Sequence, residues 1–119
     1  MKKTVVFDFD GVIHSYTSGW QGVDVIPDEP VKGIRDAIKD IRNAGYEVVV
    51  VSTRCHKVAG IEAIYCWLEN HNIEVDYVMP NKPPALVYID DRAICFDGES
   101  SSLLDKIERF KPWYDKETK

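Results

Sequence analysis

The sequence predicts an α/β fold, a Rossmann-like three-layer sandwich around a mostly parallel sheet of about five strands. Two observations carry this prediction. Short apolar runs rich in β-branched and aromatic residues alternate along the chain with segments of helical periodicity, as in βαβ units. In addition, the four valines at 48–51 show no polar alternation, which is typical of a central strand that is buried on both faces.

The expected elements follow in chain order. Strands are expected at residues 5–9, 46–51, 75–79 and 86–89, with a short edge strand at 93–96. Apolar residues at three- and four-residue spacing predict helices at 30–44 and 61–70, the first capped by Gly45. A third helix runs from an N-cap at Ser101 or Ser102 to residue 110, and residues 111–119 are a polar end. Residues 80–85 contain three prolines and form too short a link for a helical crossover.

Composition bounds the possible functions. With 119 residues, 45% hydrophobic and 29% charged, we expect one domain over residues 1–119. A formal net charge of −5 makes nucleic acid or an anionic membrane an unfavoured partner. No apolar run approaches the ~18 residues that span a bilayer, and Asp8 and Asp10 interrupt the apolar start, so we expect no signal peptide. Three cysteines without paired spacing indicate a reducing, cytoplasmic location.

Acidic pairs end two of the expected strands. Asp8 and Asp10 lie two residues apart and so share a face at the carboxyl end of the first strand, where open α/β sheets bind ligands. Asp90 and Asp91 end a later apolar run. Like charges about 4 Å apart cost roughly 4 kcal/mol at an effective dielectric constant near 20. Oxygen ligands without nearby Cys or His therefore indicate Mg²⁺, the alternative being a solvated acidic turn at each strand end.

Three further polar residues follow strands. Ser52 and Thr53 come after the valine run, and Lys82 lies in the linker after the next strand. A carboxylate can attack phosphorus while a second one protonates the leaving oxygen. A hydroxyl and an ammonium can hold the phosphoryl oxygens during this transfer. The combination is typical of a phosphoryl-transfer site.

These residues, in this order, resemble the motifs of the haloacid dehalogenase superfamily, whose members are mostly Mg²⁺-dependent phosphatases with an aspartyl-phosphate intermediate. The resemblance covers residues 5–91 and implies that Asp8 is the nucleophile and Asp10 the general acid/base. It implies substrate binding by Ser52, with Thr53 as substitute, and by Lys82. The metal ligands that it implies are Asp8, the backbone carbonyl of Asp10, and Asp91. Asp90 is either a further ligand or a residue that contacts the ligands.

The segments that carry caps in this superfamily are short here, so the chain resembles a capless member. The loop at 14–27 has room only for a flap, in which Tyr16 and Trp20 are either substrate contacts or packing anchors. His14 is expected to face solvent, and Arg54 either meets substrate or lies in a solvated loop. An open site leaves the phosphorylated substrate unidentified and allows a second subunit to act as a lid, as in a homo-oligomer.

Two other functions are weighed against the phosphatase. A phosphoacceptor receiver domain is also α/β and uses aspartates, a hydroxyl and a lysine. In a receiver domain, however, an adjacent acidic pair comes first along the chain and a lone aspartate comes later. This is the reverse of the order here. The other alternative is a non-catalytic, phosphate-binding regulatory domain that keeps the fold. Sustained Mg²⁺-dependent release of phosphate distinguishes the enzyme from both.

Overall fold

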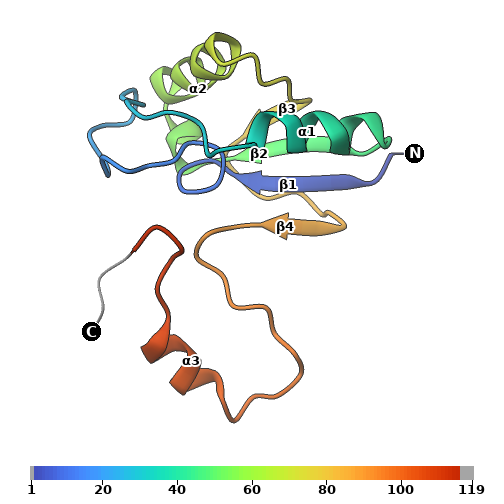
Figure 1. Ribbon diagram of the computed structural model, residues 1–119, viewed down its shortest axis with the longest axis vertical. Helices are drawn as coiled ribbons and strands as arrows, with labels where there is room; N and C mark the ends of the chain where they lie inside the picture. Colours follow the sequence, from blue (N-terminus) through green and yellow to red (C-terminus); the bar gives the residue numbers. More distant parts are fainter. Residues whose placement is uncertain (1, 116–119) are drawn as a thin grey trace.

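A four-stranded, all-parallel sheet forms the centre of the structure, a computed structural model that describes residues 2–115 (Figure 1). Its strands are β1 (Thr4–Asp8), β2 (Glu47–Val51), β3 (Tyr77–Met79) and β4 (Val87–Ile89), in the spatial order β3-β2-β1-β4. The helices are α1 (Ile34–Asn43), α2 (Val58–Asn70) and α3 (Leu103–Arg109), with a 3₁₀ helix, η1 (Thr53–His56), between β2 and α2. The α/β class is thus confirmed.

The hydrophobic core lies on one face of this sheet. Alternate residues of β1 and β2 point to it, and both α1 and α2 pack against it. Its fully buried members include Phe7, Val48, Val50, Ile38 of α1 and Ile64 of α2. Since both helices contribute to a single cluster, they cover the same side of the sheet.

The prediction of a three-layer sandwich is wrong for residues 2–115. On the second face, Val6, Val49 and Val51 pack with Met79 and with Ala85 of the linker between β3 and β4. Residues 80–86 are too few to form a crossover helix, and their prolines oppose one. An extended segment therefore contacts this face where a second helical layer was expected.

Two helices begin at other positions than the sequence indicates. Helix α1 starts at Ile34 because Gly33, its N-cap, has φ 81°, a left-handed conformation that interrupts helical geometry. The preceding Val31 N–H donates to the carbonyl of Ile13 and so belongs to the loop packing. Gly45, with φ 98°, follows the end of α1 as predicted. Helix α2 starts earlier than predicted, at Val58.

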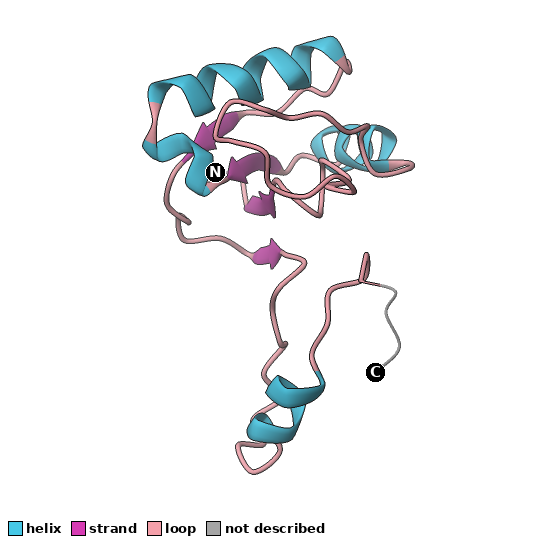
Figure 2. Cartoon of the chain, turned by 90° about the vertical axis from the view of Figure 1, so that its left-hand side faces the viewer, coloured by secondary structure: helices cyan, strands magenta, loops and turns pink. Residues whose placement is uncertain are grey.

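The chain leaves the sheet after β4, and the predicted edge strand at 93–96 is wrong. Residues 92–112, called the arm, run away from β4, form α3 and return (Figures 1 and 2). Phe96 is 59% exposed, and α3 has no buried residue. A strand needs a neighbour for its backbone hydrogen bonds, and these residues have left the edge of the sheet. The described part of the sheet therefore has four strands rather than five.

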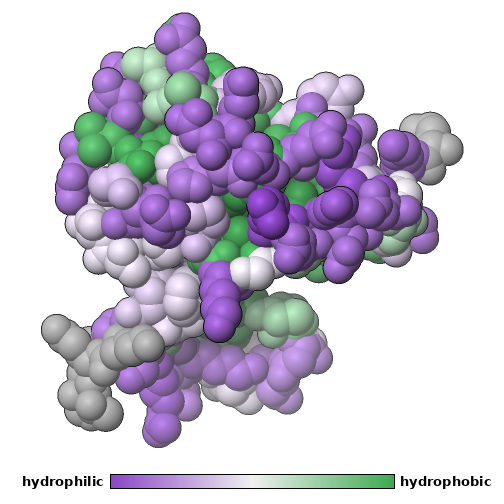
Figure 3. Space-filling view, turned by 45° about the horizontal axis from the view of Figure 1, so that its top comes forward, coloured by the Kyte–Doolittle hydropathy of each residue, from purple (hydrophilic) through white to green (hydrophobic). Residues whose placement is uncertain are grey.

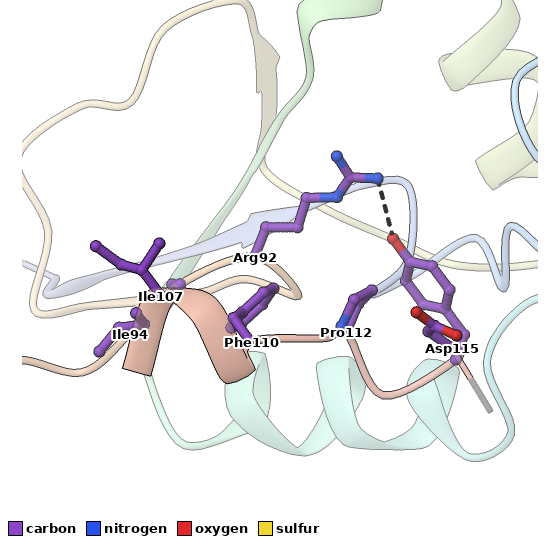
Figure 4. Close-up of a pocket in the computed structure, with 8 residues that line it drawn as sticks. Arg92, Ile94, Ile107, Phe110, Pro112 and Asp115 are labelled. Atoms are coloured by element: carbon purple, nitrogen blue, oxygen red, sulfur yellow. Dashed lines mark hydrogen bonds between the residues drawn. The ribbon is translucent and has the colours of Figure 1, made fainter. Parts of the chain in front are cut away.

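An open pocket of about 800 Å³ lies between the arm and the residues that follow it (Figure 4). Apolar side chains of the arm line most of it, and Arg92 extends from it toward the Tyr114 hydroxyl, which accepts a hydrogen bond at 3.5 Å. The lining residues are Arg92, Ala93, Ile94, Ile107, Phe110, Pro112, Tyr114 and Asp115.

The surface over the helices is largely hydrophilic, with smaller hydrophobic areas between the charged side chains (Figure 3). Among the helices of residues 2–115, none has the length and apolar content to cross a bilayer.

Candidate active site

The predicted site residues come together at the carboxyl ends of the four strands, around an open pocket of about 630 Å³. In a parallel sheet these ends meet at one edge, which is why residues far apart in sequence converge here. The register of β1 and β4 explains why the acidic residues of the two strands lie close together. Phe7 of β1 pairs with Ile89 of β4, and an aspartate follows each of them. The pocket is lined by Asp8, Asp10, Tyr16, Trp20, Val51, Ser52, Thr53, Pro80, Asn81, Lys82, Asp90, Asp91, Arg92 and Tyr114.

Three carboxylates form a cluster that is able to hold a cation. Asp8, Asp90 and Asp91 each offer one oxygen, and these oxygens lie within 4.8 Å of one another. All three side chains are partly buried. The two acidic pairs thus converge through one member of the first pair and both members of the second.

The cluster changes the acidity of Asp8. Burial, a hydrogen bond with Asp91 and the negative charges of Asp90 and Asp91 together raise the pKa of Asp8 to about 8. Without a cation, the folded protein therefore holds a proton on this cluster at neutral pH. A bound cation would favour the ionised carboxylate, which is the form that a nucleophile needs.

This raised pKa predicts a pH-dependent stability of the metal-free protein. Between the ordinary pKa of 3.8 and about 8, the folded state binds a proton that the unfolded state has released. The free energy of unfolding therefore falls as the pH rises through this range. Since water screens part of the shift at a partly buried carboxylate, we expect the melting temperature in EDTA to drop by at least roughly 5 °C between pH 5 and pH 9. Asp8→Asn should flatten this dependence, and saturating Mg²⁺ should reduce it; an equal slope in the variant would contradict the assignment.

Asp10 lies outside the carboxylate cluster because two basic side chains hold it. Arg54 donates from Nε to Oδ2 at 2.9 Å and from a terminal nitrogen to Oδ1 at 3.2 Å. His14 Nδ1 lies 2.8 Å from Oδ1. Burial alone would raise the pKa of Asp10, but the hydrogen bonds from His14 and Arg54 and the charge of Arg54 outweigh it and lower that pKa. The predicted metal ligation by the Asp10 backbone carbonyl stays a prediction.

Arg54 is fully buried and joins the site to the flap, residues 15–29, which is the blue loop at the left of Figure 1. Its remaining nitrogen donates to the carbonyls of Gly22, Val23 and Val25 at 2.8, 2.9 and 3.2 Å. Of the two interpretations of Arg54, a solvated loop is wrong. Its place after β2, at the edge where the acidic residues gather, was the only signal in the sequence.

His14 is buried rather than solvent-facing. The Asp28 N–H donates to His14 Nε2 at 3.1 Å, so the hydrogen of the neutral imidazole lies on Nδ1 and points to Asp10. The ring also stacks on Phe9, with centroids 5.7 Å apart. This burial could not be predicted from the sequence, because the contact depends on the fold of the flap.

Ser52 is better placed than Thr53 to bind a phosphoryl oxygen. Its Oγ accepts a hydrogen bond from the Arg54 N–H at 3.1 Å, which caps η1 and leaves the hydroxyl hydrogen for an anion. Ser52 is buried, whereas Thr53 is exposed as the first residue of η1. Both line the pocket, so Thr53 remains the substitute.

Lys82 lies at the pocket but pairs with Asp90. Its ammonium is 3.1 Å from Asp90 Oδ2, and the Arg92 N–H donates to Asp90 Oδ1 at 2.9 Å. Burial opposes ionisation of Asp90, but these two contacts outweigh it and lower its pKa. Half of the Lys82 side chain is exposed, so the ammonium can also reach a ligand in the pocket.

Asp91 contacts the C-terminal residues, which sequence reasoning missed. The Tyr114 hydroxyl donates to Asp91 Oδ2 at 2.9 Å, and Trp113 Nε1 donates to the Gly11 carbonyl at 2.6 Å. Gly11 has φ +85°, and a side chain there would collide with Asp91 and the Tyr114 ring. Trp113 and Tyr114 fall in the expected polar end, and only their aromatic character set them apart from it.

No protein-family model matches the chain, and no curated protein sequence matches it significantly. Two solved structures of similar fold are chains of the structures titled "Structure of the Pnkp1/Rnl/Hen1 RNA repair complex" and "Structure of Pnkp1/Rnl/Hen1 complex". The TM-scores are 0.56 and 0.53 at 17% and 16% identity, covering 92% and 95% of this chain. The chain spans about a third of those chains, 33% and 36%.

At such low identity the likeness shows the fold alone. Together, the fold and the site define an α/β protein with a carboxylate cluster at the carboxyl edge of a parallel sheet.

Proposed function

We propose that this protein is a Mg²⁺-dependent phosphatase of the haloacid dehalogenase type, which hydrolyses phosphate monoesters through an aspartyl-phosphate on Asp8. One observation carries the proposal: the oxygens of Asp8, Asp90 and Asp91 lie within 4.8 Å of one another beside a hydroxyl and an ammonium. These groups supply a nucleophile, ligands for a cation and donors to a phosphoryl group, which phosphoryl transfer requires.

In the first half-reaction, an Asp8 oxygen attacks phosphorus as the bond from phosphorus to the leaving oxygen breaks. Ser52, which is buried at the end of β2, donates to one phosphoryl oxygen. Lys82, in the linker after β3, balances the negative charge. The product is a phosphoryl group on Asp8 and an alkoxide that needs a proton.

Asp10 supplies and later recovers that proton. In the free protein, Arg54 and His14 keep it ionised. A bound phosphate dianion raises the pKa of a nearby carboxyl, so we expect Asp10 to take up a proton when the substrate binds. After donating to the leaving alkoxide, the Asp10 carboxylate accepts a proton from water as that water attacks phosphorus. The bond from phosphorus to Asp8 then breaks and releases phosphate.

The donor set fits Mg²⁺. It consists of carboxylate oxygens, with no Cys or His in the cluster, and its mutual repulsion calls for a divalent cation. Asp8 and Asp91 would hold the ion, with the Asp10 backbone carbonyl, while Asp90 is already engaged by Lys82. Bound there, the ion would offset negative charge on the nucleophile and on the phosphoryl group.

The direct test is phosphate release from a panel of phosphate esters. We expect sustained turnover of an aryl phosphate with Mg²⁺, at least a hundredfold slower after EDTA treatment and restored by added Mg²⁺. A metal-loaded protein that takes up a single phosphoryl group without sustained release would instead support the receiver-like alternative. Phosphate binding without any transfer would support the non-catalytic one.

The panel should include a phosphorylated nucleic-acid end. One of the two similar folds belongs to an RNA repair complex, and the other belongs to a complex of the same three components. The net charge of −5 disfavours a nucleic-acid surface in general, but a terminal phosphate needs only local contacts. The substrate itself stays open among phosphate monoesters, and the cytoplasmic location stays a prediction.

We also propose that a second subunit associates with the chain through the arm, as in a homo-oligomer. Large apolar side chains of the arm support it, since Phe96, Leu104 and Ile107 are 59%, 68% and 60% exposed. Such side chains favour association when they gather on one segment. Light scattering after gel filtration should give the molar mass of a homodimer, about twice 13.6 kDa. Leu104→Lys should shift it to the monomer; a monomeric wild type would overturn this proposal.

A further inference from the structure

Trp20 projects from the flap into the same pocket as the reactive carboxylates. It lines this pocket together with Asp8 and Ser52, and it is 55% exposed. A packing anchor would be largely covered, as Trp67 is at 7%. The exposed indole therefore has surface to offer to a ligand in the pocket.

The ring is held in position from one side. The Arg54 guanidinium carbon lies 4.6 Å from the centroid of the Trp20 ring, within the range of a cation–π contact. Arg54 is itself fixed by Asp10 and by the flap carbonyls. One face of the indole is thus occupied and its orientation set, so a ligand that stacks on the other face orders little additional structure.

Two tyrosines lie at the same pocket. Tyr16, in the flap, has a left-handed backbone with φ 62°, which a non-glycine residue adopts only where its surroundings impose it. Its ring meets the Tyr114 ring edge-on at 6.3 Å and the His14 ring at 5.9 Å. The lining of the pocket thus combines carboxylates, hydroxyls and an ammonium with three aromatic rings.

We propose that Trp20, with Tyr16 beside the same pocket, is a stacking platform for a flat ring on the leaving alcohol, so that the preferred substrates are nucleotide-type phosphate monoesters. This inference rests on the proposed phosphatase function. A pocket of about 630 Å³ is in the size range that holds a mononucleotide. The Trp20 ring is separated from the Asp10 carboxylate by a single guanidinium group, which places it beside the leaving-group side of the reaction.

The test compares substrates with and without the ring. Adenosine 5′-monophosphate is measured against ribose 5-phosphate, and adenosine 3′-monophosphate against glycerol 2-phosphate. For at least one pair we expect kcat/KM to be roughly tenfold higher with the base, and Trp20→Ala to bring this ratio near one. Because Trp20 also packs on Arg54, both substrates can slow, so the ratio is the readout. Trp20→Phe should keep most of the preference.

Tyr65→Ala is the matched control, since this tyrosine on α2 is 48% exposed and lies outside the residues that line the pocket. It should leave the ratio unchanged. Wild-type ratios near one for both pairs, or a preference that Trp20→Ala does not reduce, would overturn the platform.

A binding measurement tests the inference independently of catalysis. Calorimetry with the Asp8→Asn variant should show the same tenfold preference for the adenosine phosphates and its loss when Trp20→Ala is added. If the wild type hydrolyses none of the four compounds, this affinity ratio alone decides the platform, while turnover of the aryl phosphate separately decides the proposed function. Equal affinities would overturn it.

A phosphorylated dinucleotide distinguishes between a nucleic-acid end and a free nucleotide as the source of the stacking ring. If its kcat/KM exceeds that of the mononucleotide and depends on Trp20, a nucleic-acid end is the substrate. If the mononucleotide is better and depends on Trp20, a free nucleotide is the substrate. A dinucleotide and mononucleotide that are both indifferent to Trp20→Ala would contradict the inference.

Discussion

Replacing Asp8 by asparagine is expected to lower kcat at least a thousandfold while the protein stays folded. Asparagine keeps the shape of the side chain but removes the oxygen nucleophile, and loss of a nucleophile costs several orders of magnitude in related chemistry. The substitution also removes one charge from the cluster of Asp8, Asp90 and Asp91. We therefore expect the variant to have a melting temperature at least equal to that of the wild type in EDTA at pH 8, where the carboxylates of the cluster repel one another.

Two measurements make this result specific. Brief incubation of the wild type with labelled substrate should give a hydroxylamine-sensitive label, as an acyl phosphate does, and Asp8→Asn should give none. Asp36→Asn, at a carboxylate of α1 that is 74% exposed and is not among the residues that line the pocket, should keep wild-type kcat. Full activity of Asp8→Asn in independently purified preparations would rule out the assigned nucleophile.

Replacing Arg54 by methionine is expected to destabilise the fold by about 3 kcal/mol. Methionine fills most of the volume but leaves the Asp10 carboxylate without its cation and the flap carbonyls without a donor. Because Asp10 remains 20% exposed, water offsets part of the loss, so we take the lower end of the range for broken buried pairs. The melting temperature should fall by roughly 10 °C or more.

Arg35→Met is the matched control for this prediction. Arg35 is 57% exposed and lies 3.6 Å from Asp36, so its replacement should change stability by less than about 0.5 kcal/mol. Urea unfolding of both variants and the wild type measures the difference. An Arg54→Met protein as stable as Arg35→Met would show that the buried guanidinium does not hold the flap to the site.

The strands could be predicted where the local pattern decides the structure. The valines of β2 are apolar without interruption, and such a run has few alternatives to a central strand. The run at 93–96 looks similar but forms no strand, because strand formation depends on a neighbour that local pattern does not reveal. The start of α1 was misplaced for a related reason, since the contact of Val31 with Ile13 is tertiary.

The carboxylates of the site could be predicted because strand ends in a parallel sheet share an edge. Asp8 is the last residue of β1 and Asp91 comes two residues after β4, and the adjacency of these strands was enough to bring them together. The environment of Asp10 could not be predicted, since His14 and Arg54 reach it only once the flap has folded. Tyr114 joins the site from 23 positions beyond Asp91, at the end of an irregular path.

The arm begins and ends at the same place, because Arg92 at its start contacts Tyr114 just beyond its end, while its tip lies away from the sheet. A loop closed at its base can lengthen at its tip with little penalty, about 0.6 kcal/mol for each doubling. The tip of the arm should therefore tolerate insertions. Extra residues, or a whole folded module, inserted near α3 would leave the geometry of the strand ends intact.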